Sequence, residues 1–390
     1  MKQPYGYRSP KMVAMDVTLL VLHDPPTDDL PPLTRLLAEA RHRLADEQEQ
    51  RFRQAGVARV LRLPGRGSAG TPVGSFGEYL ASIVAAERPT SLIVMGSGAV
   101  PRLTTRDARR LVTVAAADEP KALTNNRYSS DIIAVARAAV LADLPPLPSD
   151  NALPRWLEEH AGYAVADLPG RDRLTLDLDS PLDIGLWALA RDSPAWAREV
   201  VHAHQLAVPR TDDLRALARD PSRELLVFGR AGSRTLQWLE RNVRCRVRFL
   251  AEERGLRASS PLAIGGENET AGSRGPTRPP HATLGRLLGH RGPEALRSIV
   301  EELADGAILD TRVLMADRLG AAEDAWPPAE DRYASDLLRT DRVVDPWLRT
   351  LTDAASRAAI PIALGGHTLV GPGISLLLAP PASAPAGRQL

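Results

Sequence analysis

Three acidic residues in the sequence Leu-Asp-Leu-Asp-Ser-Pro-Leu-Asp are the first candidates for chemistry. Asp177 and Asp179 alternate along the end of a predicted strand at 174–178, so they share one face, and Asp183 lies about one turn into the next predicted helix. Carboxylates that converge in this way bind Mg²⁺, which prefers one or two of them together with substrate phosphates. The segment also fits helix capping, with Asp179 or Ser180 as the N-cap and a proline at the first helical position. Both interpretations can hold, because a cap needs only one of the acids.

A second candidate is the polar segment Thr124–Asp131, which lies between a predicted strand and a predicted helix at 131–141. Such a density of hydrogen-bonding side chains is hard to explain by packing. Asn125 and Asn126 could read a base or hydroxyl groups, and Arg127 could pair with a phosphate through two hydrogen bonds. The alternative is a helix N-cap surrounded by polar surface residues. The residues assigned to ligand contact here are Asn125, Asn126, Arg127, Ser130 and Asp131.

A third candidate is the loop Gly96-Ser97-Gly98, which follows a predicted strand at 91–95. In open α/β sheets, ligands bind beyond the carboxyl ends of the strands, and glycine lets the backbone approach them. These three residues are therefore assigned to ligand contact. The alternative is a tight turn from strand to helix without a ligand. The loop does not contain the Gly-x-x-x-x-Gly-Lys-[Ser/Thr] pattern of a P-loop.

The second half of the chain carries a cluster of its own. Asp310-Thr-Arg312 follows a predicted strand at 307–309, and His367 follows a predicted strand at 360–364. The segment Asp331–Asp336 opens a predicted helix. Because Asp310 and His367 both stand at strand ends, one pocket could hold both, and a His–Asp pair could do acid–base work. The alternative is a set of salt bridges and caps.

These residues are carried by alternating short apolar runs and longer amphipathic stretches. That alternation predicts βαβ units and an α/β fold with a mostly parallel sheet covered on both faces. A second series of the same kind begins near residue 212 and predicts a second, smaller α/β domain. The predicted organisation is a flexible N-terminus at 1–15, a first domain at 16–205, a second domain at 212–379 and a disordered tail at 380–390.

Composition excludes several classes of function. The 390 residues, with 25% charged and 44% hydrophobic residues, fit a globular protein of two domains. A net charge of +1 gives no electrostatic case for nucleic acid or anionic lipid. No apolar run reaches the length of about 20 residues that spans a bilayer. The single cysteine, Cys245, excludes an intramolecular disulfide, and we expect a cytoplasmic protein without membrane partners. Its many arginines would suit a homodimer.

The order of elements, together with Asp177-Leu-Asp-Ser-Pro-Leu-Asp183, resembles the nucleotidyltransferases of the nucleotide-diphospho-sugar transferase (GT-A) superfamily. Within it, the chain is most similar to phospholactate guanylyltransferases and molybdenum-cofactor nucleotidyltransferases, over roughly residues 17–189. The resemblance implies a Rossmann-like GT-A three-layer sandwich, an NTP substrate and Mg²⁺. Two features depart from the family pattern. A metal-binding aspartate of the family falls on Ala99, and an acidic loop at 23–29 replaces its basic glycine-rich loop.

Three hypotheses about function follow. The first is Mg²⁺-dependent transfer of a nucleotidyl group from NTP to a phosphorylated small molecule, with Asp179 and Arg127 as catalytic residues and Asp177, Asp179 and Asp183 as metal ligands. The second is a catalytically silent binding or scaffold protein with a ligand site in the C-terminal domain. The third is a glycosyltransferase that uses a nucleotide sugar.

Overall fold

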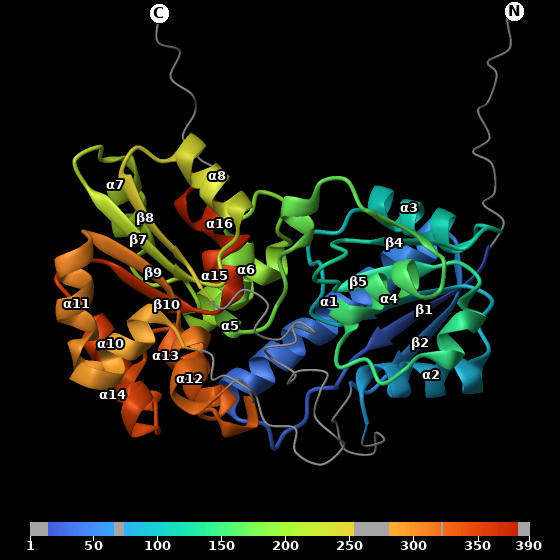
Figure 1. The fold of residues 1–390 in the computed structure, drawn as a ribbon, viewed down its shortest axis with the longest axis horizontal. Coiled ribbons are helices and arrows are strands. Elements are labelled where there is room, and N and C mark those ends of the chain that lie inside the picture. Colours follow the sequence, from blue (N-terminus) through green and yellow to red (C-terminus); the bar gives the residue numbers. More distant parts are fainter. Residues whose placement is uncertain (1–14, 66–73, 253–280, 321–322, 381–390) are drawn as a thin grey trace, which may run out of the picture. The chain divides into compact units, whose positions relative to one another are not determined.

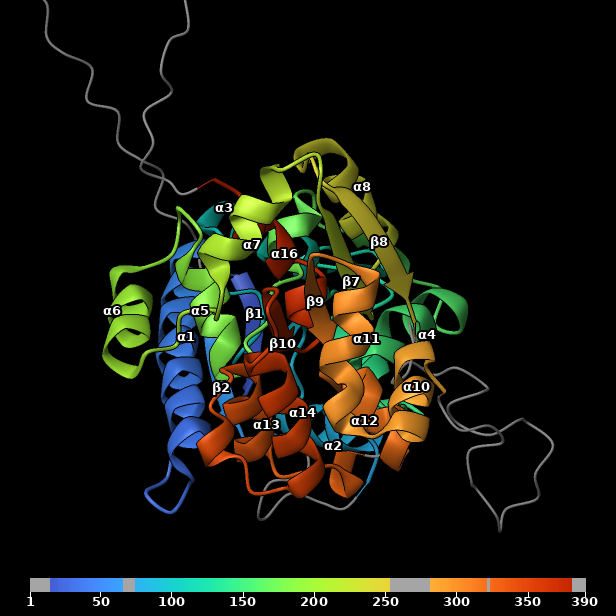
Figure 2. The ribbon, with the colours of Figure 1, turned by 90° about the vertical axis from the view of Figure 1, so that its left-hand side faces the viewer.

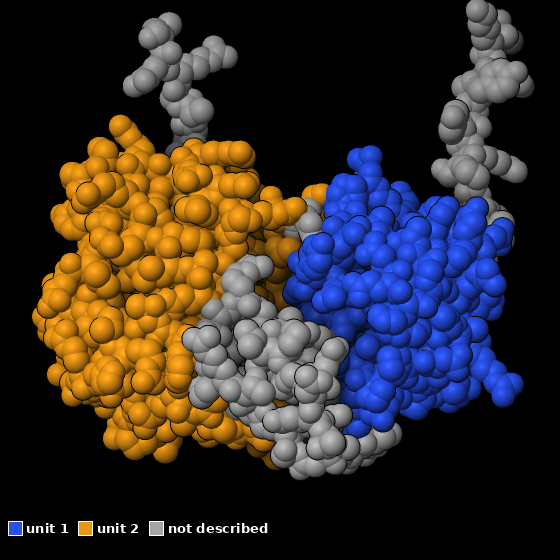
Figure 3. Space-filling view, in the orientation of Figure 1, with its two compact units in different colours: residues 1–24, 44–97, 103–169 blue, residues 25–43, 98–102, 170–390 orange. Residues whose placement is uncertain are grey.

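The computed structural model describes residues 15–65, 74–252, 281–320 and 323–380. The chain packs as two compact units, drawn in blue and orange in Figure 3. The first unit takes residues 1–24, 44–97 and 103–169, and the second takes 25–43, 98–102 and 170–390. The packing therefore divides at 169/170, whereas the sequence places a boundary near 205–212, which stays a prediction.

The first unit is built on a six-stranded sheet with the strand order β2-β1-β3-β5-β4-β6. β1 runs parallel to β2 and β3, β4 runs parallel to β6, and β5 is antiparallel to both of its neighbours. The strands are β1 (Met15–Leu22), β2 (Val57–Leu63), β3 (Leu92–Gly96), β4 (Lys121–Thr124), β5 (Ile132–Val135) and β6 (Ala164–Asp167). The helices that begin or lie in this unit are α2 (Phe76–Glu87), α3 (Thr105–Ala115) and α4 (Leu153–Glu159). Helices α2 and α3 lie on opposite faces of the sheet (Figure 1).

The central strand β1 forms where the sequence is continuously apolar. Val17, Leu19, Leu20 and Val21 are fully buried, as expected for a strand covered on both faces. Helix α2 begins at a capping box, in which the Ser75 hydroxyl accepts from the amide of Glu78 and the Glu78 carboxylate accepts from the amide of Ser75. Helix α1 (Pro32–Ala55) crosses from the second unit into the first at residues 43/44.

The predicted helix at 131–141 is wrong. The chain forms strand β5 there, followed by a short 3₁₀ helix at Ala138–Asp143. All four residues of β5 are buried, and three of them are β-branched, which suits a strand inside a sheet better than a helix. Arg137 then adopts a left-handed backbone conformation with φ of 50°, so an α-helix cannot run through it.

The second unit contains a four-stranded sheet in which every pair of neighbours is parallel, with the order β10-β9-β7-β8. Its strands are β7 (Glu224–Gly229), β8 (Arg246–Ala251), β9 (Gly306–Asp310) and β10 (Ile362–Gly365), and Figure 2 shows them side by side. The chain leaves β7 for β8 on one side and returns to β9 on the other side. The direction of winding therefore reverses between β7 and β9.

The second unit contains most of the helices in the described part of the chain. They are α5 (Pro181–Ala188), α6 (Ala195–His204), α7 (Thr211–Arg219), α8 (Ser233–Asn242), α10 (Thr283–Arg291), α11 (Leu296–Leu303), α12 (Thr311–Leu319), α13 (Ala329–Asp336), α14 (Pro346–Ser356), α15 (His367–Val370) and α16 (Gly373–Leu378). Two Rossmann-like α/β sheets in one chain confirm the predicted fold class. No helix in the described ranges is both long and apolar enough to cross a membrane.

Candidate functional site

The site is best built from Asp183, whose carboxylate is buried at the start of α5. Its Oδ2 accepts hydrogen bonds from the amide of Asp179 at 2.9 Å, the amide of Ser180 at 2.7 Å and the hydroxyl of Ser180 at 3.0 Å. Burial raises the pKa of Asp183 well above its usual range, and the negative charge of Asp179 adds to the rise. Asp183 therefore closes the capping box of α5 and fixes the backbone on which Asp179 stands.

Asp179 itself projects from that cap and keeps 51% of its side chain exposed. One oxygen, Oδ1, accepts a hydrogen bond from Nη2 of Arg41 at 3.3 Å, and the other, Oδ2, lies 3.8 Å from Nδ1 of His367. Arg41 is fixed in turn, because its Nε donates to the carbonyl of Leu178 at 2.6 Å. The Asp179 carboxylate thus lies between a guanidinium and an imidazole, all three within the second unit.

Asp177 lies beside the backbone of Gly98. The predicted strand at 174–178 is wrong, since the chain makes only a single antiparallel bridge, between Asp177 and Ala99, after a 3₁₀ turn. The amide of Leu178 donates to the carbonyl of Gly98 at 3.0 Å. A Cβ on Gly98 would lie 2.9 Å from Nε of Arg41 and 3.0 Å from the carbonyl of Leu178. Glycine is therefore needed here by the approach of the unit's own groups.

The cluster predicted in the second half of the chain lies at the carboxyl edge of the second sheet. Asp310 ends β9 and is paired in register with Gly365 at the end of β10, so Asp310 and His367 stand on adjacent strands. Arg230, directly after β7, clamps Asp310 with Nε 2.7 Å from Oδ2 and Nη2 3.1 Å from Oδ1. Burial alone would raise the pKa of Asp310, but Arg230, Arg312 and His367 together outweigh it and the pKa is lowered.

The Arg230–Asp310 pair straddles the point where the winding of the sheet reverses. A Cβ on Gly229, whose φ is +122°, would lie 2.3 Å from Cβ of Asp310, so the two strand ends approach too closely for any other residue. In doubly wound sheets, ligands bind in the crevice at this point. The edge of the sheet is therefore a place where a ligand is expected.

A second buried pair lies behind it. Arg312 donates from Nη2 to Oδ2 of Asp336 at 2.7 Å and from Nη1 to Oδ1 of Asp336. Burial opposes the charge of Arg312, but Asp336, Asp310 and Asp183 outweigh it and raise its pKa. Burial raises the pKa of Asp336, although Arg312 opposes this. The Asp183 cap, Asp310 and the Arg312–Asp336 pair thus form one connected set of charges.

Asp331 does not join that set. Its Oδ2 accepts from the amides of Val344 at 2.9 Å and Asp345 at 2.6 Å, so it holds the chain that leads into α14. Arg41 was missed by the sequence analysis, because nothing in the amphipathic helix around it distinguishes it from other surface arginines. Only its hydrogen bonds to Leu178 and Asp179 reveal it.

The polar segment Thr124–Asp131 lies in the first unit, as the turn between β4 and β5. Asn125 is buried and holds the turn closed, with Oδ1 accepting from the amide of Asp131 at 3.0 Å and Nδ2 donating to Oδ2 of Asp131 at 2.7 Å. The hydroxyl of Ser130 lies 2.9 Å from that of Thr124. Much of this polarity therefore serves the turn itself. Asn126 is only partly buried, and its Oδ1 accepts a hydrogen bond from the amide of Tyr128.

Arg127 is also engaged inside the first unit. Its amide donates to Oδ1 of Asp167 at 2.8 Å, its Nη2 donates to the carbonyl of Val165 at 2.9 Å, and its Nη1 lies 3.2 Å from Glu158. The guanidinium is thus shared between β6 and α4. The ligand role assigned to Arg127 stays a prediction.

Gly96 and Ser97 end β3 in the first unit. The amide of Ser97 donates to the carbonyl of Leu22 at 3.0 Å, so the ends of β1 and β3 are held together. A Cβ on Gly96 would meet no atom within 4 Å. In contrast to Gly98, this glycine borders open space, which leaves room for a ligand beyond the strand.

The acidic residues can be tested against the needs of Mg²⁺. In the described part of the chain, no group of three or more His, Cys, Asp or Glu residues is placed to hold a metal ion. Asp183 is buried and already uses Oδ2 for its three capping bonds, so Asp177 and Asp179 remain as the candidate ligands. Two carboxylates, completed by substrate phosphates and water, are the ligand set that Mg²⁺ commonly takes in proteins.

No protein-family model and no curated protein sequence matches this chain. Among solved structures, it is similar to a putative nucleotide-diphospho-sugar transferase from Desulfovibrio desulfuricans, with 11% identity and a TM-score of 0.35, over 49% of this chain and 96% of that one. It is also similar to Rv0371c from Mycobacterium tuberculosis, with 20% identity and a TM-score of 0.24, over 44% of this chain and 96% of that one. A second structure of Rv0371c, a complex with manganese, gives the same values.

Proposed function

We propose that this chain is a nucleotidyltransferase-like protein that carries out Mg²⁺-dependent transfer of a nucleotidyl group from NTP to a phosphorylated small molecule. The observation that carries the proposal is the Asp179 carboxylate. It is half exposed at the edge of a parallel sheet, and Arg41 and His367 flank it within 4 Å. An oriented, accessible carboxylate of this kind suits a metal that is shared with phosphate oxygens.

In this proposal, Asp177 and Asp179 would hold the metal. When bound, Mg²⁺ would neutralise charge on the triphosphate and polarise the phosphorus that is attacked. Arg41 would orient Asp179 through its hydrogen bond, and Asp183 would keep the backbone of Asp179 in place. Arg41 would supply fixed positive charge near the phosphates, and His367 a hydrogen-bonding group. Groups that are oriented in advance stabilise a transition state more than they stabilise the ground state.

The turn Thr124–Asp131 stays a predicted contact for the nucleotide or the acceptor. Its less buried part is testable separately, because Asn126 can be changed without removing the bonds of the buried Asn125. An Asn126→Ala variant that keeps its stability and loses nucleotide affinity would support that role.

The test measures the thermal unfolding of the protein in the presence of GTP, CTP, ATP or UTP, each with and without Mg²⁺ or Mn²⁺. A ligand present at about 100 times its dissociation constant should stabilise the protein by about 2.7 kcal/mol. We expect one nucleotide to stabilise the protein only in the presence of metal, and Asp179→Asn to abolish that effect. Asp192→Asn is the matched control, because Asp192 is 47% exposed and also pairs with an arginine, Arg102. No stabilisation by any nucleotide, or equal stabilisation of both variants, would overturn the proposal.

The second candidate function is a catalytically silent binding protein with its ligand at the second sheet. The Arg230–Asp310 pair favours it, because it straddles the crevice where ligands of doubly wound sheets bind. Nucleotide binding without release of pyrophosphate would support this function. Release of pyrophosphate would instead support nucleotidyl transfer, and release of a nucleoside mono- or diphosphate from a nucleotide sugar would identify a glycosyltransferase.

A further inference from the structure

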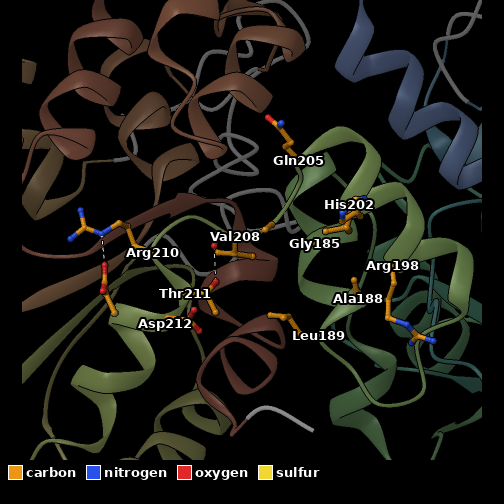
Figure 4. Close-up of a pocket in the computed structure, with 13 residues that line it drawn as sticks. Gly185, Ala188, Leu189, Arg198, His202, Gln205, Val208, Arg210, Thr211 and Asp212 are labelled. Atoms are coloured by element: carbon orange, nitrogen blue, oxygen red, sulfur yellow. Dashed lines mark hydrogen bonds and ion pairs between the residues drawn. The ribbon is translucent and has the colours of Figure 1, made fainter. Parts of the chain in front are cut away.

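A cavity of about 840 Å³ lies in the second unit, formed by the end of α5, by α6 and by the start of α7 (Figure 4). None of the residues that line it belongs to the set of charges around Asp179 and Asp310. Cavities of 300–1,000 Å³ with an apolar wall and a few polar groups are the usual size and make-up of small-molecule sites.

Part of the wall of this cavity is apolar. It includes Ala188 and Leu189 at the end of α5, Val201 on α6, and Val208 in the connection to α7. Gly185 also lies in the wall. A Cβ at this position would lie 2.2 Å from the carbonyl oxygen of Leu206, so a larger residue does not fit. The connection between α6 and α7 therefore packs directly on α5 and closes one side of the cavity.

Hydrogen bonds hold the connection between α6 and α7 that lines the cavity. Gln205 and Arg210, which both line it, adopt left-handed backbone conformations with φ of 54° and 58°. Such residues persist only where the surrounding structure holds them. Nη2 of Arg339 supplies that hold, since it donates to the carbonyls of His204 at 2.7 Å and Gln205 at 2.9 Å. The hydroxyl of Thr211 adds a bond to the carbonyl of Val208 at 2.6 Å (Figure 4).

The charges around the cavity are unequal on its two sides. At the start of α7, Asp213 is paired with Arg210 at 2.7 Å and Asp212 lies 3.8 Å from Arg215, so both acids are locally neutralised. On α6, Arg198 and His202 are four residues apart and face the cavity together.

Only Nη1 of the Arg198 guanidinium is used in hydrogen bonds to the described residues. Its Nη1 donates to the carbonyl and hydroxyl of Ser193 at 2.6 and 2.7 Å. Neither Arg198 nor His202 forms an ion pair with a carboxylate of the described residues. The side of α6 therefore presents an arginine that has no carboxylate partner among the described residues, together with an imidazole.

We propose that this cavity binds a small amphiphilic organic anion, with its apolar body against Ala188, Leu189 and Val208 and its carboxylate or phosphate head toward Arg198 and His202. The apolar part of the wall would supply most of the affinity through burial, and the Arg198 guanidinium would select the sign of the head group, with the His202 imidazole as a further hydrogen-bonding group. The cavity shares no residue with the Asp177–Asp179 pair. Its test is therefore independent of the test of the proposed transferase activity.

The test compares octanoate, octyl phosphate, 1-octanol and octyltrimethylammonium as probes by isothermal titration calorimetry. We expect the two anions to bind and the cation to fail, with 1-octanol weaker than either anion. Arg198→Gln should weaken the anions by about two- to fivefold, as for an exposed ion pair, and leave 1-octanol unchanged. Arg191→Gln, an exposed arginine outside the cavity wall, is the matched control and should change nothing.

A second variant keeps the proposal testable if the charge effect is small. Ala188→Phe fills the cavity from the wall and should abolish binding of every probe, while circular dichroism and thermal unfolding show that the variant folds. Octyl phosphate that binds when octanoate does not would identify a phosphate head as the preferred ligand. Equal binding of the cation, binding that survives Ala188→Phe in a folded variant, or no binding of any probe would overturn the proposal.

Discussion

The Nδ1 atom of His367 lies 3.8 Å from Oδ2 of Asp179, which joins the acidic segment before α5 to the end of the last strand of the second sheet. The sequence analysis treats these residues as members of two separate candidate sites. Their contact makes one site of them, inside one compact unit, with Arg41 on the other oxygen of the same carboxylate.

Replacing His367 tests whether the imidazole helps to position Asp179. We expect His367→Ala to weaken metal-dependent nucleotide binding by about two- to fivefold, the effect of a partly exposed charge pair, without loss of stability. Titration calorimetry with the nucleotide that binds the parent protein measures it. His290→Ala, at the exposed end of α10, is the control. Unchanged affinity in His367→Ala would show that Arg41 alone orients Asp179.

The raised pKa of Asp183 makes the stability of the protein depend on pH. Its pKa is raised in the folded state, so its contribution to stability is present at low pH and is lost as pH rises through the folded pKa. Asp183→Asn keeps an oxygen for the capping bonds and removes this charge. We therefore expect the variant to gain stability relative to the parent as pH rises from about 4 towards neutrality. Urea unfolding at several pH values measures the difference.

A variant without any capping oxygen separates the two roles of Asp183. Asp183→Ala removes both the charge and the cap, and the loss of a cap lowers helix stability by about 0.5–2 kcal/mol. It should be less stable than Asp183→Asn at every pH. A constant difference between parent and Asp183→Asn across the pH range would contradict the raised pKa.

The buried pair Arg312–Asp336 predicts strong coupling between two positions. Removing one partner leaves an uncompensated buried charge, so Arg312→Met and Asp336→Leu should each lower the free energy of unfolding by about 3–5 kcal/mol. The double variant should lose much less than the sum, because neither charge remains. A double-mutant cycle by urea unfolding measures the coupling. Additive losses would show that the two side chains act independently.

How much of this site the sequence could predict depends on how local each feature is. The capping box of Ser180 and Asp183 involves only four consecutive residues, so the sequence indicates it, and the structure contains it. The pairing of Asp310 with Arg230 depends on which strands become neighbours, and that order is set by packing. The role of Arg41 depends on the approach of residues far along the chain, for which the local sequence carries no signal.

The errors in secondary structure have the same origin. Ile132–Val135 is apolar throughout, and periodicity alone does not separate a buried strand from a helix in so short a run. Its position between β3 and β4 made it a strand. At 174–178 the run Leu-Thr-Leu-Asp-Leu predicts a strand, but in the described part of the chain Asp177 makes only a single bridge, to Ala99.

Alanine variants of Gly229 and Gly320 distinguish the cost of close strand approach from the cost of an unfavourable backbone conformation. Its φ of +122° already disfavours a side chain, and a Cβ would also lie 2.3 Å from Cβ of Asp310. Gly320 has a φ of +91° and open space around it. We expect Gly320→Ala to lower stability by about 1–3 kcal/mol, the effect of an unfavourable backbone conformation alone. Gly229→Ala should lose clearly more, because β7 and β9 must move apart. Similar losses in the two variants would show that the sheet edge yields easily at this point.

We expect the thiol of Cys245 to be unreactive in the folded protein. It is buried, and burial raises its pKa to about 11, so at pH 8 roughly one thiol in a thousand is ionised. We expect negligible reaction with a thiol-specific disulfide reagent in the folded state and reaction of one thiol per chain after unfolding in urea. Reaction in the folded state at the rate of an exposed thiol would mean that the strand after Cys245 opens readily. A rate that rises with urea below the unfolding transition would place that opening in the second sheet, where β8 is an edge strand.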